Sequence, residues 1–427
     1  MDKRLTRRKC LRGEIITPGD KSISHRALIL NSIAKGKAHI ENLASGDDVR
    51  STMSCLRALG VNISGQGDVF TVNGVGPDGF RSPDNVLDAG NSGTTMRLLG
   101  GLLAAQPFFS VITGDDSLRS RPMDRLIHPL RHMGADIWGR KNDSLPPLAI
   151  KGHRLKGITY KLPVASAQIK SAVLIAGLFA EGKTTLIEPT PSRDHTERMI
   201  SALGVKITRD DKTIELIPSV PQAPVDVSVP GDISSAAFWL VAGAIHPDAK
   251  LRILNVGINP TRAGIIDVLL DMGAKLKVDR VVKEGGEPVA DVSIETSELM
   301  GIRIRSNMIP RIIDEIPLIA LAGAFATGTT VIRGAQELRV KESDRIRTTV
   351  TELSKLGVDI EELSDGMVIN GSGSIKGGGC ESHGDHRLAM TLGIASLVAQ
   401  GEVIIHNAES VTVSYPGFWE ELERIAG

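Results

Sequence analysis

The sequence of 427 residues has few aromatic side chains, three cysteines and no net charge. Aromatics make up only 3% of the chain, which argues against proteins that stack single-stranded nucleic acid on aromatic platforms. Its 50 Lys and Arg balance 50 Asp and Glu, so no general attraction to nucleic acid or to a membrane surface is expected. Cys10, Cys55 and Cys380 have the spacing of neither a metal site nor a disulfide framework, which predicts a reducing, cytoplasmic compartment.

Membrane, export and common catalytic motifs are also missing. The longest apolar runs, SAVLIAGLFA and IPLIALAGAFA, reach about half of a membrane span and predict buried helices. The basic N-terminus is not followed by an apolar segment, so we expect no signal peptide. The patterns G-x-S-x-G, C-x-x-C and H-E-x-x-H do not occur. We therefore expect a site that needs no metal and no cofactor and that works by electrostatic clamping and proton transfer.

The chain does contain an internal repeat. A helical run ends in Leu/Met-Gly and leads into a short strand, in CLRALGVNI, LRHMGADI, ISALGVKI, LLDMGAKL and LSKLGVDI, and a sixth run, WEELERIAG, ends the sequence. The glycine of the first five copies predicts a left-handed cap after each helix. Between them lie strongly apolar helices, each followed by a strand, as in GLFAEGKTTLIEP and SLVAQGEVIIHNA. Successive copies are roughly 65–85 residues apart, the length of one supersecondary motif.

A second symmetry divides the chain in half. PGDKSISHRALIL begins at Pro18 and PGDISSAAFWLVA begins at Pro230. We therefore predict an α/β protein with two domains of three repeats each. The first domain spans residues 18–229, and the second is discontinuous, combining 1–17 with 230–427, with hinges near 18–20 and 228–232. Because the sixth copy lacks its strand, we expect the N-terminal strand around 13–17 to complete it.

Cations stand where helices are expected to begin. A helix N-terminus carries partial positive charge and unpaired N–H groups, so Lys and Arg are unfavourable there unless an anion is also present. Five helix starts have this feature, and together they predict one shared site for a ligand with phosphates and carboxylates. The residues are Lys21 and Arg26, Arg119 and Arg121, Arg193, Lys341 and Arg345, and His386 and Arg387. Since they divide between the two halves, an anion is expected to draw the halves together.

Several of these segments also allow a purely structural interpretation. Asp20 or Ser22 can cap the first apolar helix, and Ser166 can be a plain N-cap. Asp314 and the next acid, Glu315, precede an apolar helix, where they stabilise its dipole without any catalytic role. The alternating charges of LRVKESDRIR are typical of a solvated helix face. His195 is expected at a cap or on the surface.

The motifs together resemble one enzyme family. PGDKSISHRALIL, GNSGTTMRLL, RSRPMDRL, SRDHTE, RVKESDRI and GDHRLAM follow in order from residue 18 to about 390. This series resembles the 5-enolpyruvylshikimate-3-phosphate synthases, in their class II bacterial form. The resemblance implies two domains, each with three βαβαββ repeats, arranged as an inside-out α/β barrel. It also implies transfer of the enolpyruvyl group of phosphoenolpyruvate to the 5-hydroxyl of shikimate 3-phosphate, with release of phosphate, in aromatic amino acid biosynthesis.

The same resemblance implies roles for individual residues. Asp314 would accept the hydroxyl proton, while Glu342 and Lys21 are both candidates for protonating phosphoenolpyruvate. Phosphoenolpyruvate would bind Lys21, Gly93, Arg121, Gln168, Arg345 and Arg387. Shikimate 3-phosphate would bind Lys21, Ser22, Arg26, Ser166, Ala167, Gln168, Arg193, Asp314 and Lys341.

Two other functions compete with this one. The sister transferases that act on UDP-N-acetylglucosamine carry a loop cysteine near the position of SLRSRPMD, where this chain has none. A non-catalytic polyanion-binding repeat protein would be expected to carry net positive charge. We expect a cytoplasmic monomer that binds neither nucleic acid nor membranes. Gly93 stands where alanine is associated with glyphosate tolerance in the family, so competition of glyphosate with phosphoenolpyruvate is a hypothesis.

Overall fold

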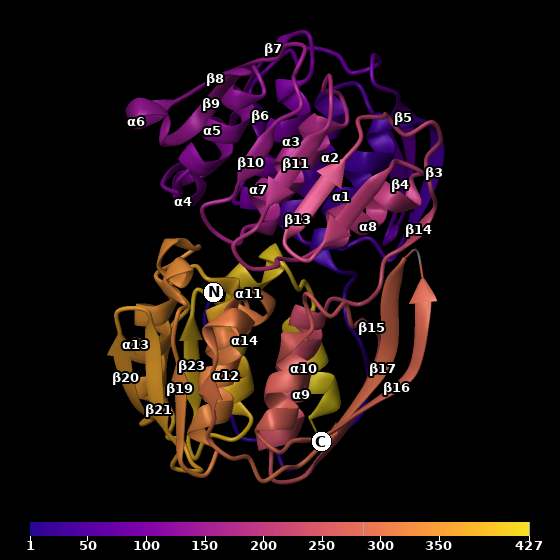
Figure 1. Cartoon of the computed structure of the whole chain (residues 1–427). Coiled ribbons are helices and arrows are strands. Elements are labelled where there is room, and N and C mark those ends of the chain that lie inside the picture. Colours follow the sequence, from indigo (N-terminus) through magenta and orange to yellow (C-terminus); the bar gives the residue numbers. More distant parts are fainter. Residues whose placement is uncertain (285, 427) are drawn as a thin grey trace. The chain divides into compact units, whose positions relative to one another are not determined.

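The protein consists of two compact units, described here from a computed structural model that covers residues 1–284 and 286–426 (Figure 1). The N unit contains Gly19–Val229 and Glu284–Glu287. The C unit contains Met1–Pro18, Pro230–Lys283 and Pro288–Gly427. Each unit is therefore built from more than one segment of the chain.

The N unit repeats the order strand, helix, strand, helix, strand, strand. Its first strand pairs in parallel with the strand after the first helix, and the last two strands add an antiparallel hairpin, as in the sheet order β6-β7-β9-β8. The helices are α1 (Lys21–Ile33), α2 (Asp47–Ala58), α3 (Gly93–Ala104), α4 (Asp116–Arg119), α5 (Asp124–His132), α6 (Arg140–Asp143), α7 (Ala167–Gly177) and α8 (His195–Ala202). The strands are β3 (Lys35–Glu41), β4 (Asn62–Gln66), β5 (Val69–Val75), β6 (Leu87–Asp88), β7 (Phe109–Thr113), β8 (Asp136–Gly139), β9 (Leu145–Lys151), β10 (Thr159–Lys161), β11 (Thr184–Ile187), β12 (Ile207–Asp210), β13 (Thr213–Leu216) and β14 (Val227–Ser228).

The C unit follows the same order of elements. Its helices are α9 (Ile233–Ile245), α10 (Gly264–Asp271), α11 (Ile309–Ile312), α12 (Ile316–Ala324), α13 (Arg345–Lys355), α14 (His386–Ser396) and α15 (Phe418–Ile425), with 3₁₀ turns at Ser306–Met308, Gln336–Val340 and Ala408–Val413. Its strands are β1 (Lys3–Leu5), β2 (Leu11–Ile16), β15 (Ala249–Gly257), β16 (Lys275–Glu284), β17 (Glu287–Glu295), β18 (Arg303–Ile304), β19 (Thr329–Ile332), β20 (Asp359–Leu363), β21 (Gly366–Asn370), β22 (Gly378–Glu381) and β23 (Val403–His406). The expected βαβαββ repeat is thus present in both units.

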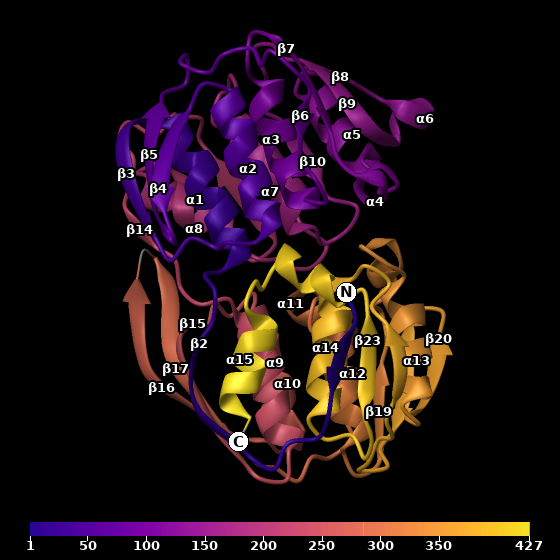
Figure 2. The same ribbon diagram turned by 180° about the vertical axis from the view of Figure 1, so that it is seen from behind.

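The N-terminal strands do not pair as we expected. The strand predicted around 13–17, β2, lies parallel to β15 and starts the fourth sheet, where Ile15 is opposite Ile253 (Figure 2). The sixth sheet is completed by β1, which runs antiparallel to β23 with Arg4 opposite Ile404. The prediction failed because β1 is only three residues long and lies in a basic stretch that does not read as a strand.

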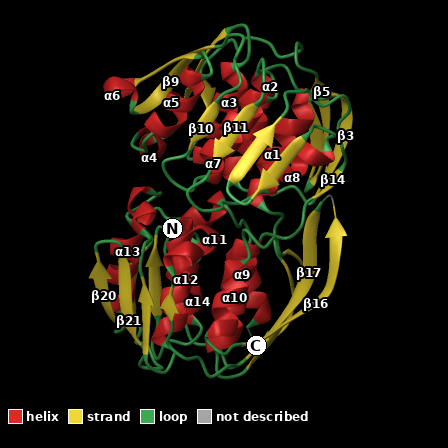
Figure 3. Ribbon diagram, in the orientation of Figure 1, coloured by secondary structure: helices red, strands yellow, loops and turns green. Residues whose placement is uncertain are grey.

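Helices fill the interior of each unit and sheets form its outer layer (Figure 3). All residues of α9, α12 and α14 are buried, and α1, α3 and α7 are almost entirely buried as well. A helix that is apolar all round has no face suited to water, so these six form the two cores. The second helix of each repeat, such as α2 or α13, buries only one side. The predicted glycine caps are confirmed by positive φ at Gly60, Gly134, Gly204, Gly273 and Gly357.

The buried helices begin at one end of each unit, and polar side chains mark that end. Asp20, Ser92 and Ser166 accept hydrogen bonds from backbone N–H groups in the first turns of α1, α3 and α7. Asp232 and Asp385 do the same for α9 and α14. Asp20 and Ser22 were the two candidates for the N-cap of α1. The N-cap is Asp20, whose Oδ1 lies 2.8 Å from the backbone N of Ile23.

Close packing of α3 on α7 leads to a test of the N-unit core. A Cβ added to Gly101 would lie 2.2 Å from the carbonyl oxygen of Ala172, which is backbone and has no rotamer to change. We expect Gly101→Ala to destabilise the N unit by about 1–3 kcal/mol. Gly100→Ala is the matched control, because its Cβ would meet only the Leu126 side chain, at 3.0 Å. Alanine gains helix propensity at both positions. Urea unfolding should therefore separate the two variants, and equal midpoints would contradict this account of the packing.

Candidate active site

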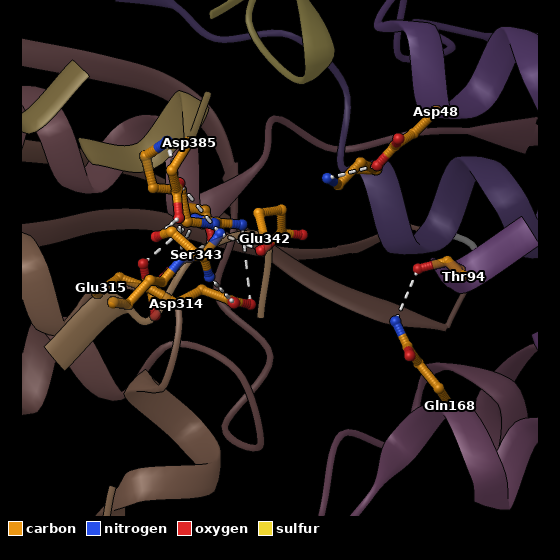
Figure 4. A network of polar contacts seen from close by, with 12 residues as sticks. Asp48, Thr94, Gln168, Asp314, Glu315, Glu342, Ser343 and Asp385 are labelled. Carbon is orange, nitrogen blue, oxygen red and sulfur yellow. Dashed lines mark hydrogen bonds and ion pairs between the residues drawn. The ribbon is translucent and has the colours of Figure 1, made fainter. Parts of the chain in front are cut away.

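Lys21 is the first residue of α1 and faces a carboxylate from α2. Its Nζ lies 2.9 Å from Asp48 Oδ2, a contact shown in Figure 4. The two side chains are 18% and 10% exposed, so the ammonium is partly shielded from water and still reachable. A lysine at this position adds a full charge to the positive end of the helix, and Asp48 offsets it. Ser22 follows in the first turn, and its carbonyl oxygen accepts from Arg26.

Arg26 is more deeply buried than its predicted role as a ligand implies. Its Nε donates to Thr196 Oγ1 at 2.6 Å, its Nη2 to Ser171 Oγ at 2.7 Å and its Nη1 to the Ser22 carbonyl at 2.8 Å. Burial lowers the pKa of Arg26 to about 10, although Glu197 and Asp20 oppose that effect. Arg26 therefore joins α1 to α7 and α8, in addition to carrying charge.

The glycine loop before α3 lies beside two arginines. Arg121 Nη2 donates to Asn91 Oδ1 at 2.6 Å and to Ser117 Oγ at 3.1 Å. A Cβ on Gly93 would lie 2.6 Å from Arg97 Nη1, so the glycine leaves room for that guanidinium. Arg97 was missed by the sequence analysis, although it follows Gly93 by one helical turn in GTTMRL.

Gln168 connects α7 to α3. Its Oε1 accepts from Arg97 Nη1 at 2.7 Å, and its Nε2 donates to Thr94 Oγ1 at 2.9 Å (Figure 4). Ser166 serves as the N-cap of α7 and Ala167 is the first residue of that helix. Arg193 lies in the loop before α8, close enough to Arg26 for the two charges to oppose each other. The N unit thus gathers the predicted residues Lys21, Ser22, Arg26, Gly93, Arg121, Ser166, Ala167, Gln168 and Arg193 at the starts of its buried helices.

Acids and arginines alternate where the buried helices of the C unit begin, and Figure 4 labels the acids Asp314, Glu315, Glu342 and Asp385. Arg345 Nε lies 2.6 Å from Asp385 Oδ2, and its Nη2 lies 2.5 Å from Glu342 Oε2. Its Nη1 lies 3.4 Å from Asp314 Oδ1, and Arg387 Nη2 lies 3.7 Å from Asp314 Oδ2. Four of the predicted residues, Asp314, Glu342, Arg345 and Arg387, therefore meet in the C unit.

Burial and charge act in opposite directions on Arg345. Burial by itself would lower its pKa, but the carboxylates of Asp385, Glu342 and Asp314 outweigh burial and raise the pKa above its ordinary value. Asp385 shows the reverse balance. Burial would raise the pKa of Asp385, whereas the Arg345 guanidinium lowers it below the ordinary value of 3.8. Both groups are thus held in their charged forms.

Glu315, the acid after Asp314, has a structural role that the sequence did not distinguish. Its side chain is fully buried, and Arg262 Nη1 lies 2.9 and 3.1 Å from its two carboxylate oxygens. Ser234 of α9 donates a further hydrogen bond to it. Arg387 Nη1 lies 3.9 Å away, so Glu315 supports the arginine next to Asp314.

Lys341 lies beside the acidic cluster of the C unit, whereas His195 is buried in the N unit. Lys341 follows the 3₁₀ turn Gln336–Val340 and is half-buried, one residue before Glu342. The alternating charges around it do not form a solvated face, because Arg345 is 2% exposed. His195, expected at a cap or on the surface, is buried with its Nδ1 2.9 Å from Glu287 Oε1.

Across residues 1–284 and 286–426, no three His, Cys, Asp or Glu side chains gather as metal ligands.

Comparison with known proteins agrees with this geometry. Residues 5–422 match the family model described as EPSP synthase (3-phosphoshikimate 1-carboxyvinyltransferase). The chain belongs to the EPSP synthase family. The 3-phosphoshikimate 1-carboxyvinyltransferase of Bacillus cereus strain G9842 is 54% identical over 416 residues, which is 97% of each chain. The enzyme of that name from Desulforudis audaxviator is 52% identical over 426 residues, covering 100% of this chain and 99% of its own.

A solved structure extends the similarity to three dimensions. The EPSP synthase of Acinetobacter baumannii superposes with a TM-score of 0.89 at 44% identity, over 100% of this chain and 98% of its own. The resemblance inferred from the motifs is therefore confirmed for both family and fold. In the part of the chain that the structure describes, no helix is long and apolar enough to cross a membrane.

The buried Asp385–Arg345 pair makes the stability of this protein at acid pH testable. A carboxylate whose folded pKa is lowered stabilises the fold above its unfolded pKa of 3.8, and that contribution is lost as the pH falls through the folded pKa. We expect Asp385→Asn to cost about 3–5 kcal/mol at neutral pH, because it leaves Arg345 short of a partner. The difference from wild type should shrink below about pH 4.

The measurement is chemical denaturation across pH. Asp116→Asn serves as the control, since the Asp116 side chain is 97% exposed and its removal should leave the pH profile unchanged. A wild-type advantage over Asp385→Asn that stayed constant down to pH 2 would contradict the assigned ionisation.

Proposed function

We propose that this member of the EPSP synthase family transfers the enolpyruvyl group of phosphoenolpyruvate to the 5-hydroxyl of shikimate 3-phosphate and releases phosphate. The observation that carries the proposal is the position of Asp314, a carboxylate flanked by Arg345 at 3.4 Å and Arg387 at 3.7 Å. The reaction requires an acceptor for the hydroxyl proton beside cations that bind an anionic partner. Asp314 with its two arginines meets both requirements.

The proposed binding sets follow the family's motifs. Shikimate 3-phosphate binds Lys21, Ser22, Arg26, Ser166, Ala167, Gln168, Arg193, Asp314 and Lys341. Phosphoenolpyruvate binds Lys21, Gly93, Arg121, Gln168, Arg345 and Arg387, to which we add Arg97, because it contacts Gln168 and faces Gly93. Both substrates are anionic, and guanidinium groups bind phosphate and carboxylate oxygens in pairs of hydrogen bonds.

The chemistry divides between two proton transfers. Asp314 takes the proton of the substrate hydroxyl, and Glu342 or Lys21 delivers a proton to the methylene carbon of phosphoenolpyruvate. The hydroxyl oxygen then attacks the adjacent carbon, which gives a tetrahedral adduct that still carries phosphate. The group that delivered the proton then takes one back from the new methyl group as the bond from carbon to the phosphate oxygen breaks, which restores the double bond. The arginines balance the charge of the departing phosphate, and the hydroxyl proton held by Asp314 leaves with it or passes to solvent. Glu342 lies 2.5 Å from Arg345, so a change in its protonation alters the charge next to Asp314.

We extend the proposal to the setting of the enzyme. It acts in the cytoplasm as a monomer on these two small molecules, without a cofactor and without nucleic acid or membrane partners. All three cysteines are free thiols, which fits a reducing compartment.

Phosphate release with each candidate acceptor tests the function. We expect release from phosphoenolpyruvate when shikimate 3-phosphate is present and none above background with UDP-N-acetylglucosamine. The reason is that this chain lacks the loop cysteine that the sister transferases carry near the position of SLRSRPMD. Turnover with the nucleotide sugar instead would assign the chain to the sister transferases. Salt-dependent RNA binding without turnover would indicate a polyanion-binding protein.

Removal of Asp314 tests the assigned proton acceptor. We expect Asp314→Ala to lower kcat by about 100-fold or more, because a general base contributes on this scale. Binding of both substrates should stay measurable by calorimetry, since the cations remain. Asp267→Ala is the control, because Asp267 pairs with Arg311 at 2.6 Å and lies outside the proposed set. Near-normal turnover of Asp314→Ala would remove Asp314 from the mechanism.

A further inference from the structure

A buried ion pair lies directly behind the loop that carries Arg193. Lys170 of α7 and Glu188, the residue after β11, are each 0% exposed, and Lys170 Nζ lies 3.2 Å from Glu188 Oε2. The proposed mechanism uses neither residue. We propose that the Lys170–Glu188 pair is a positioning device that sets the Arg193 guanidinium for the phosphate of shikimate 3-phosphate. This inference rests on the proposed role of Arg193 in binding that substrate.

The pair holds every polar group of the residue before Arg193. The backbone N–H of Ser192 donates to Glu188 Oε1 at 3.2 Å, and Ser192 Oγ donates to the same oxygen. The carbonyl oxygen of Ser192 accepts from Lys170 Nζ at 3.2 Å. Ser192 is therefore held at both its N–H and its carbonyl, which restricts where the backbone of Arg193 can begin.

The far end of the loop is fixed by the same cluster. Lys170 Nζ lies 2.7 Å from Glu197 Oε1 in the first turn of α8, and Ser171 Oγ lies 2.6 Å from Thr196 Oγ1. Arg209 of β12 approaches Glu188 and Glu197 to 3.5 and 3.6 Å and balances the second carboxylate. The segment 188–197 is thus tied at its start and its end to one helix, α7, and Arg193 lies between the two ties.

That helix also carries other residues proposed to bind shikimate 3-phosphate. Ser166 caps α7 and Gln168 is two residues before Lys170, so the ion pair sets Arg193 in register with both. Apolar residues of similar volume often replace a buried ion pair without loss of stability. Stability alone therefore does not explain why this pair is charged. A positioning role does explain it, because only polar side chains can hydrogen-bond the N–H, the hydroxyl and the carbonyl of Ser192.

Glu188→Gln is the sharpest variant. Glu188 uses one oxygen to accept from Ser192 and the other to accept from Lys170. A glutamine has a single acceptor oxygen, and its NH₂ group would face either the ammonium or the Ser192 N–H. The loop must therefore shift, while side-chain volume is unchanged. We expect kcat/KM for shikimate 3-phosphate to fall by about 10- to 100-fold, since a misplacement of about 1 Å has effects of this size. KM for phosphoenolpyruvate should change by less than about twofold.

Glu352→Gln is the matched control for loss of a buried carboxylate. Glu352 is also 0% exposed, pairs with Lys355 at 2.8 Å and accepts from the backbone N of Glu381 at 2.9 Å. It belongs to the C unit, whereas the Arg193 loop belongs to the N unit. Its replacement should lower the unfolding midpoint but leave KM for shikimate 3-phosphate unchanged. An equal rise in that KM for both variants would reduce Glu188 to a general structural role and overturn the proposal.

A double-mutant cycle with Arg193→Ala separates this proposal from the proposed function. If Glu188 acts through Arg193, the variant Glu188→Gln/Arg193→Ala should bind shikimate 3-phosphate no more weakly than Arg193→Ala alone. Additive losses in calorimetric Kd would overturn the positioning role and leave the role of Arg193 intact. If Arg193→Ala itself bound shikimate 3-phosphate as tightly as wild type, both the assignment of Arg193 and the positioning role would be wrong.

Discussion

The site depends on one constraint of the fold, the meeting of the N-terminal ends of three buried helices at one end of each unit. The first helix of every repeat enters the core in the same sense because each repeat has the same order of strands and helices. The positive ends of α1, α3 and α7 therefore come together, as hydrogen bonds from Arg26 to Ser171 and from Gln168 to Thr94 show. Helix ends with unpaired N–H groups provide an anion site before any side chain contributes.

Side chains then give the two units different characters. In the N unit, Lys21 pairs with Asp48, and arginines nearby donate to neutral oxygens, as Arg97 does to Gln168. In the C unit, the arginines are interleaved with carboxylates, and Arg345 alone contacts three. An excess of cations suits the binding of phosphate, whereas a carboxylate held between arginines suits proton transfer. The same backbone arrangement thus supports both tasks.

Local patterns in the sequence predicted much of this. Helix starts, glycine caps and the sixfold repeat follow from short-range rules, and the structure confirms them. Strand pairing does not follow, because β1 joins β23 across some 400 residues and its three residues carry no strand signal. Arg97 and Lys170 were missed, and Glu315 was not distinguished from Asp314, for a related reason. Nothing within a few residues of Lys170 distinguishes it from a solvated lysine. Its structural role depends on the ion pair with Glu188, which only the folded chain brings close.

A comparison between repeats shows how buried charge is used in both units. Ser192 precedes α8 and Ser343 precedes α13, so both serines occupy the loop before the second helix of a repeat. Ser192 is bound by Glu188, which pairs with the buried Lys170, and Ser343 donates at 3.1 Å to Asp385, which pairs with the buried Arg345. In each case a buried acid and cation hold the serine next to a residue proposed to contact substrate, Arg193 or Glu342. Loops are the flexible parts of such a repeat. Residues on them that contact substrate therefore need directional hydrogen bonds that fix the loop backbone. A buried ion pair forms such directional hydrogen bonds to the loop. An apolar contact of equal stability could not hold the loop in this way.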